Sequence, residues 1–160
     1  MMRRRSQLLV QVAIAVIERN GRYLISRRRP ADHLGGYWEF PGGKRRVGES
    51  WETCLRRELR EELGITATLT ERLPSIRFRY PDRQVRLEVF RCGIQEGRPR
   101  PLACEEIRWV RAAQLRQYRF PPADRQLIRS LSMVKPLSHH LSLGPKGRHR
   151  LRRWSPSAMR

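Results

Sequence analysis

Large aliphatic residues recur at every second position near the start of the chain. Every second residue from Val10 to Val16 is aliphatic, and this period of two predicts a buried β-strand at about 8–17. Asn20 and Gly21 follow. Because this pair favours the positive φ angles of two-residue turns, it predicts a hairpin into a second strand at about 22–28.

The same segment has a second interpretation. Arg3, Arg4 and Arg5 precede the apolar run at 8–17, an arrangement that a short signal peptide shares. Gln11 interrupts the run, and the alternation favours a strand. We expect no segment long enough to span a bilayer, and therefore a soluble, cytoplasmic protein.

A helical period replaces the alternation after residue 50. Leu55, Leu59 and Leu63 lie at i, i+4 and i+8, so they form one apolar stripe that would seat a helix on a sheet. Ser50 is a suitable N-cap and Gly64 a suitable C-terminal stop. The pattern predicts a helix over 50–63.

The rest of the chain returns to short apolar runs. Further strands are predicted near 67–72, 75–80, 84–93 and 107–110, and the segment through 41–43 is expected to be irregular. A last helix is predicted from about 122 or 123 to 133, with Leu127, Ile128 and Leu131 facing inward. Strands and helices in this order predict an α/β sandwich with a mixed sheet.

Three carboxylates share one face of the helix predicted over 50–63. Glu58, Glu61 and Glu62 are one to four residues apart, so their side chains point the same way. Such a face repels itself, and hard divalent cations are its usual partners. Oxygen ligands without a His or Cys cluster suit Mg²⁺ or Mn²⁺ rather than zinc. Because the leucine stripe packs inward, we expect this face to point away from the core.

These carboxylates belong to a longer pattern with fixed offsets. It consists of Gly43, Glu49, Arg57, Glu58, Leu59, Glu61, Glu62, Gly64 and Ile65. A solvated helix with i,i+4 ion pairs would look partly similar. The glycine and the loop glutamate ahead of the helix make the segment resemble the Nudix box instead. Arg57 is expected to fix the site by pairing with Glu49 or Glu61.

Outside the box the chain is similar to MutT-type nucleotide pyrophosphohydrolases, from about Gln7 to Leu131. The similar segments are Arg27-Arg28, Trp38-Glu39-Phe40-Pro41-Gly42-Gly43-Lys44, Tyr80-Pro81-Asp82-Arg83 and Phe120-Pro121-Pro122-Ala123-Asp124. The resemblance implies a Nudix-type α/β/α sandwich with a mixed β-sheet. It also implies hydrolysis of nucleoside triphosphates to the monophosphate and pyrophosphate, with oxidised purines such as 8-oxo-dGTP as substrates and nucleotide pool sanitation, a form of DNA repair, as the role.

The resemblance implies roles for single residues. The metal ligands would be Glu58, Glu61, Glu62 and the carbonyl of Gly42. The catalytic residues would be Arg57, Glu58, Glu61 and Glu105. The substrate-binding residues would be Arg28, Phe40, Lys44, Tyr80, Arg83 and Asp124. Simpler explanations exist for several of them, because aromatic side chains beside turns also fill cores, and a run of three arginines includes solvated ones.

Two positions depart from the family pattern. Asp124 stands where the bacterial prototype has Asn, whose amide accepts from N7–H and donates to O6 of the oxidised purine. An ionised carboxylate only accepts, unless burial raises its pKa, and Asp124 could instead cap the last helix. In the bacterial prototype the catalytic glutamate lies several residues before a tryptophan. The same spacing counted back from Trp109 reaches Ala103, so Glu105, or else Glu106, is expected to take the catalytic role.

Charge is distributed unevenly over the 160 residues. The formal net charge is +20, and residues 133–160 carry seven Lys and Arg and no acid. We expect a basic extension at 1–6, one domain at 7–132 and a flexible basic tail at 133–160. A solvated tail without a specific partner is the simpler interpretation, and nonspecific contact with nucleic acid is the alternative that its charge allows. Cys54, Cys92 and Cys104 have no CxxC spacing and are expected to be reduced. Monomer and dimer both stay open.

Three functional hypotheses are compatible with these residues and with the family resemblance. The main prediction is a Mg²⁺-dependent pyrophosphohydrolase of oxidised purine nucleotides. A second keeps the chemistry and changes the substrate to CTP or a modified pyrimidine nucleotide, a dinucleotide cofactor or an RNA 5′ end. A third is a noncatalytic nucleic-acid-binding module on the same scaffold, which the intact box disfavours.

Overall fold

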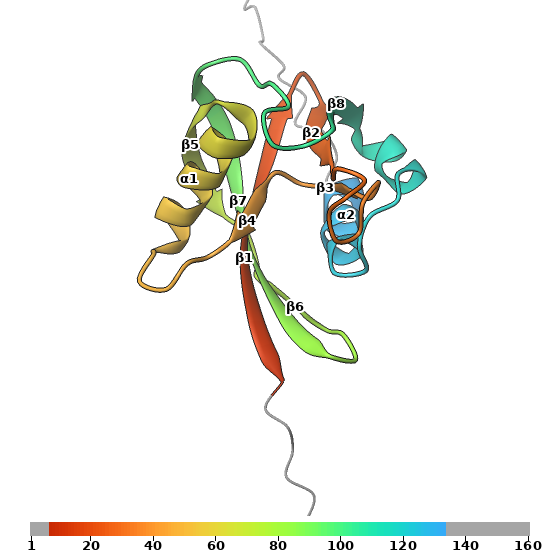
Figure 1. The fold of residues 1–160 in the computed structure, drawn as a ribbon. Helices are drawn as coiled ribbons and strands as arrows, with labels where there is room; N and C mark the ends of the chain where they lie inside the picture. Colours follow the sequence, from red (N-terminus) through yellow and green to blue (C-terminus); the bar gives the residue numbers. More distant parts are fainter. Residues whose placement is uncertain (1–6, 134–160) are drawn as a thin grey trace, which may run out of the picture.

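The computed structural model describes residues 7–133. One mixed sheet lies between two helices, with α1 on one face and α2 on the other (Figure 1). The strands are β1 (Leu8–Arg19), β2 (Arg22–Arg27), β3 (Trp38–Glu39), β4 (Gly42–Lys44), β5 (Thr66–Arg72), β6 (Ile76–Arg79), β7 (Arg83–Glu96) and β8 (Glu106–Arg111). The helices are α1 (Trp51–Leu63), the 3₁₀ helix η1 (Ala112–Gln117) and α2 (Asp124–Met133). The predicted α/β sandwich is confirmed.

The sheet is built around the long strands β1 and β7. Its order is β3-β2-β1-β7-β5, while β4 pairs with β1, β6 with β7 and β8 with β2. Strands β1 and β7 run parallel from Leu8↔Arg83 to Ile17↔Cys92, and the other pairs are antiparallel. The lower parts of β1, β7 and β6 extend beyond both helices as an arm (Figure 1).

Strand β1 is buried on both faces where it crosses the centre of the molecule. Ile14 and Val16 pack into the cluster that includes Leu127 and Ile128 of α2. The intervening Ala13 and Ala15 pack into the cluster on the α1 side. The alternation of larger and smaller apolar residues therefore serves two cores, one on each face of the sheet.

Helix α1 has the predicted ends and the predicted buried face. The Ser50 hydroxyl accepts a hydrogen bond from the Thr53 main-chain N–H at 3.1 Å. Gly64 ends the helix in the left-handed conformation at φ 69°. Leu55, Leu59 and Leu63 are fully buried. Caps and apolar stripe are both local properties of the sequence, which is why they were predictable.

The prediction of an irregular segment at 41–43 was wrong. The chain there forms β4, which pairs with β1 at Val12↔Lys44 and Ile14↔Gly42. A Cβ at Gly42 would lie 2.0 Å from the carbonyl oxygen of Ala13, so this close pairing requires glycine. The short strand β3 and the helix η1 were also not predicted.

Other predictions have mixed outcomes. Cys54, Cys92 and Cys104 are free thiols in the core. No helix among the described residues is long and apolar enough to cross a membrane. The extensions predicted at 1–6 and beyond 133 lie outside the described residues, and the domain boundaries stay predictions.

Candidate active site

Arg57 organises the acidic end of the site. Its guanidinium bonds both carboxylate oxygens of Glu49, and its Nη1 lies 2.7 Å from Glu58 Oε1 and 3.2 Å from Glu61 Oε2. The Nη2 also donates to the carbonyl of Lys44 at 3.2 Å. The bonds from Arg57 lower the pKa of Glu49 to about 2. The predicted pairing of Arg57 with Glu49 or Glu61 is confirmed, since it pairs with both.

Glu62 does not face away from the core, contrary to expectation. Only 8% of its surface is exposed. Its Oε1 accepts from the Ser26 hydroxyl at 3.3 Å and its Oε2 from the Gly42 main-chain N–H at 3.2 Å. Burial, followed by repulsion from the nearby Glu39, raises the pKa of Glu62 to about 8. Through these two bonds the last turn of α1 is joined to β2 and β4. The face that carries the carboxylates is therefore partly exposed to solvent and partly buried.

The donor set of this region suits a hard divalent cation. The oxygens on offer are those of Glu58, Glu61 and Glu62 and the main-chain carbonyl of Gly42. A Cβ at Gly43 would lie 2.3 Å from the Glu58 carboxyl carbon, so glycine lets this carboxylate lie against the main chain. Across residues 7–133, no three acidic, His or Cys side chains converge at metal-ligand distances, and Arg57 is the cation that pairs with Glu58 and Glu61.

The predicted substrate residues line one cavity. It has a volume of about 690 Å³, which is the size of pockets that hold nucleotide-sized ligands. Its walls include all six predicted substrate-binding residues, namely Arg28, Phe40, Lys44, Tyr80, Arg83 and Asp124. Gly42, Gly43 and Glu58 line the same cavity. The structure therefore joins segments that are up to 96 positions apart in the sequence, from Arg28 to Asp124.

The aromatic residues serve both the core and the cavity wall. Phe40 is 2% exposed and packs against Phe120, with ring centroids 5.4 Å apart. The Tyr80 hydroxyl accepts from the Ala123 main-chain N–H at 3.4 Å, which ties the β6–β7 turn to the start of α2. The guanidinium of Arg83 lies 4.9 Å from the Tyr80 ring centroid. Phe40 and Tyr80 therefore both pack with the core and line the cavity.

Two carboxyl groups, the buried Asp124 and the half-buried Glu39, line the cavity. Asp124 is 6% exposed, and burial, followed by repulsion from Glu39, raises its pKa to about 7. It is the first residue of α2, so it lies within the first turn rather than ahead of it as an N-cap. Burial also raises the pKa of Glu39 to about 7, although Arg28 lies 3.3 Å away. Glu39 had no predicted role, and its position between Trp38 and Phe40 in a quoted segment was the available signal.

Four predicted residues lie outside the cavity wall. Arg57, Glu61 and Glu62 belong to the adjoining α1 network. Glu105 is instead held by Arg27, with Nε and Oε2 3.1 Å apart. The neighbouring Glu106 also pairs with Arg27 at 3.1 Å. Catalysis by Glu105 therefore stays a prediction.

Comparison with protein families agrees with this arrangement. The model of the NUDIX domain matches residues 12–130. The chain belongs to the Nudix family. The match spans β1 through most of α2, so it includes the box, the cavity and both cores of this Nudix hydrolase.

The alignments with known relatives cover almost the whole length of those relatives. A CTP pyrophosphohydrolase of Escherichia coli K12 is 32% identical over 127 residues, which are 79% of this chain and 94% of the relative. An 8-oxo-dGTP diphosphatase of the same strain is 32% identical over 126 residues, 78% of this chain and 98% of the relative. The crystal structure of a MutT protein from Methanosarcina mazei Go1 has a TM-score of 0.71 at 25% identity, covering 79% of this chain and 94% of that one.

Proposed function

We propose that this Nudix hydrolase is a Mg²⁺-dependent nucleoside triphosphate pyrophosphohydrolase that removes oxidised purine nucleotides such as 8-oxo-dGTP. The observation that carries this proposal is the single cavity, which has a carboxylate and a lysine at one end and aromatic residues with a buried carboxyl group at the other. The first end suits a triphosphate and the second a base. The relatives named above support the same substrate class.

At the phosphate end, Glu58, Glu61, Glu62 and the carbonyl of Gly42 would hold Mg²⁺ or Mn²⁺. The ion would neutralise phosphate oxygens and lower the pKa of the attacking water. Lys44 and Arg28 would contact the phosphates or the sugar. Glu61 is the more exposed box carboxylate, with 51% of its side chain accessible, whereas Arg27 holds Glu105. This difference supports Glu61 as the group that accepts the proton of the water.

At the base end, a protonated Asp124 matches 8-oxoguanine. Its hydroxyl would donate to O6, and its carbonyl oxygen would accept from N7–H. A pKa of about 7 keeps half of the groups protonated at neutral pH. The burial that raises the pKa thus supplies the donor that an ordinary aspartate lacks.

CTP is the second candidate, because the same residue suits it in the other protonation state. An ionised carboxylate accepts from the N4 amino group of cytosine. One of the relatives is named as a CTP pyrophosphohydrolase. Asp124 would therefore favour the oxidised purine below its pKa and cytosine above it.

The test is pyrophosphate release from 8-oxo-dGTP, dGTP and CTP at pH 6 and pH 8.5 with Mg²⁺. The ratio of kcat/KM between two substrates cancels pH effects on the shared metal site. We expect 8-oxo-dGTP to exceed dGTP by about tenfold or more at pH 6, since leaving a buried donor or acceptor without a partner costs about 1–3 kcal/mol. We also expect the ratio of 8-oxo-dGTP to CTP to fall at pH 8.5. Equal turnover of 8-oxo-dGTP and dGTP at both pH values would contradict the proposal.

Asp124→Asn is the matched variant for this test. Its amide donates and accepts at every pH, so its ratio of 8-oxo-dGTP to CTP is expected to stay constant between pH 6 and pH 8.5. A ratio that falls equally in the variant would assign the pH dependence to another group.

A further inference from the structure

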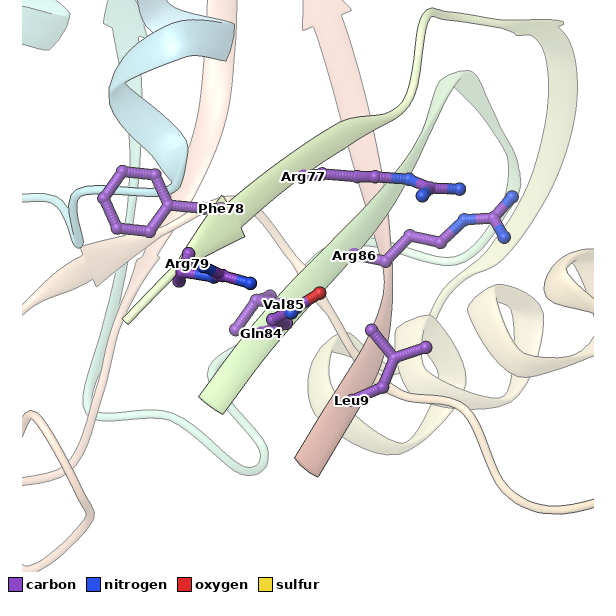
Figure 2. Close-up of a pocket in the computed structure, with 7 residues that line it drawn as sticks. All are labelled: Leu9, Arg77, Phe78, Arg79, Gln84, Val85 and Arg86. Atoms are coloured by element: carbon purple, nitrogen blue, oxygen red, sulfur yellow. The ribbon is translucent and has the colours of Figure 1, made fainter. Parts of the chain in front are cut away.

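The arm of the sheet has an arginine-rich face on the side opposite the substrate cavity. Arg77 and Arg79 of β6, Arg86 of β7 and Leu9 of β1 line a hollow of about 230 Å³ there. We call these four residues the arginine face. Figure 2 shows Arg77 and Arg86 extending side by side from neighbouring strands, with Leu9 below them and Phe78 pointing away.

The alternation of side chains separates this face from the cavity. Arg86 lies over the ring of Trp51, the first residue of α1, at 5.4 Å from its centroid, so the arginine face is on the α1 side. The intervening Val85 and Leu87 belong to the core on the α2 side and line the substrate cavity, and Val85 also borders the hollow of the arginine face. One hairpin thus presents two different surfaces.

The arginine face has positive charge that the protein leaves unbalanced. Arg77 and Arg86 are direct partners across the β6–β7 pair, and like charges in this position are destabilising. Glu88 compensates Arg86 at 2.6 Å. Within residues 7–133, neither Arg77 nor Arg79 has a carboxylate partner, and both side chains are exposed. An anionic ligand would remove the repulsion.

We propose that the arginine face binds the backbone of single-stranded nucleic acid. Guanidinium groups match phosphate oxygens with two parallel donors. Arg77 and Arg79 are two residues apart on one strand, about 6.7 Å, which is comparable with the distance between successive phosphates of an extended strand. Leu9 is 51% exposed beside them and offers apolar surface that an unpaired base can cover. A duplex hides its bases, and inorganic polyphosphate has none.

The test is fluorescence anisotropy of a labelled 20-nucleotide thymidine strand with the full chain. The variant Arg77→Gln/Arg79→Gln removes the two unpaired charges. The matched control Arg60→Gln/Arg98→Gln removes two exposed charges that, among the described residues, also lack a carboxylate partner. We expect Kd to rise about tenfold in the first variant and less than twofold in the control. For a single strand, each phosphate contact contributes about 0.7 to the magnitude of the slope of log K against log salt. Loss of two contacts should therefore reduce that magnitude by about 1.4 in the first variant.

Four outcomes would overturn the proposal. Equal Kd values for the wild type and the first variant would assign binding to the basic tail. Displacement of the strand by dGMP would assign it to the substrate cavity. Displacement by inorganic polyphosphate at an equal phosphate concentration, or equal binding of a duplex, would show that bases are not recognised. Hydrolysis of the preferred nucleotide should be unchanged in the first variant, which confirms that it is folded.

Discussion

Replacing Asp124 by Asn should stabilise the protein at alkaline pH. Asp124 is 6% exposed, and burial, followed by repulsion from Glu39, raises its pKa from 3.8 to about 7. One pKa unit is 1.36 kcal/mol, so the ionised form carries a penalty of about 4 kcal/mol in the folded state. Asparagine has nearly the same shape and no charge.

The penalty depends on pH in a defined direction. Because the pKa is higher in the folded state than in the unfolded state, folding is favoured most below pH 4, where both states are protonated. Stability is lost as the pH rises from about 4 to about 7, and the full penalty applies above that. The free energy of unfolding of the variant relative to the wild type should therefore increase by about 2.5 kcal/mol between pH 5 and pH 8.

Urea denaturation at pH 5, 6, 7 and 8 without added metal measures this difference. Asp32→Asn is the control, since Asp32 is exposed, and its difference from the wild type should not follow the same course. A pH-independent effect of the new amide on the free energy of unfolding cancels when the differences at two pH values are compared. If the difference between Asp124→Asn and the wild type were the same at pH 5 and pH 8, the carboxyl group would not be held in its neutral form.

Three further variants test the rest of the site and the core. Glu61→Gln should reduce kcat for pyrophosphate release by about 100-fold or more, with Glu52→Gln as an active control. Gly43→Ala should raise the Mg²⁺ concentration needed for half-maximal rate, because the new Cβ would lie 2.3 Å from the carboxyl carbon of Glu58; Gly93→Ala, with open space around its Cβ, should not. Burial raises the pKa of Glu88, but its bonds to two arginines outweigh this and hold the pKa below its usual range, so Glu88→Gln should lose about 3 kcal/mol of stability at pH 7. That loss should shrink as the pH falls below about 4, and a pH-independent loss in chemical denaturation would contradict it.

Local patterns predicted the elements that depend on neighbours in sequence. The caps and leucine stripe of α1 and the alternation in β1 are of this kind, and the structure has them. The pairing of Arg57 with Glu61 followed from the i,i+4 offset on one helix, whereas its partner Glu49 lies in the loop ahead of that helix. The family resemblance supplied the cavity residues, which lie on segments that no local pattern connects.

The environment of individual carboxylates was not predictable in the same way. Glu62 is buried because Ser26 and Gly42, which are 36 and 20 positions away, bond its two oxygens. The position of β4 depends on its pairing with β1, and its glycine-rich sequence has no strand preference of its own. The pKa of Asp124 depends first on its burial and then on Glu39, another residue of the cavity wall. Each of these facts is set by tertiary contacts.

The distribution of charge explains why acidic groups are held neutral in so basic a protein. The net charge is +20, yet Glu39, Glu62 and Asp124 all have pKa values raised to about 7 or 8. Most of the arginines lie on the surface, where water screens them, and burial of the carboxyl groups is the larger effect. A nucleoside triphosphate would be attracted by the surface and would reach a cavity whose wall carries Arg28, Lys44 and Arg83. Arg28 is paired with Glu39 and Arg83 with Asp82, so Lys44 and a divalent ion on the box carboxylates would decide where the phosphates come to rest.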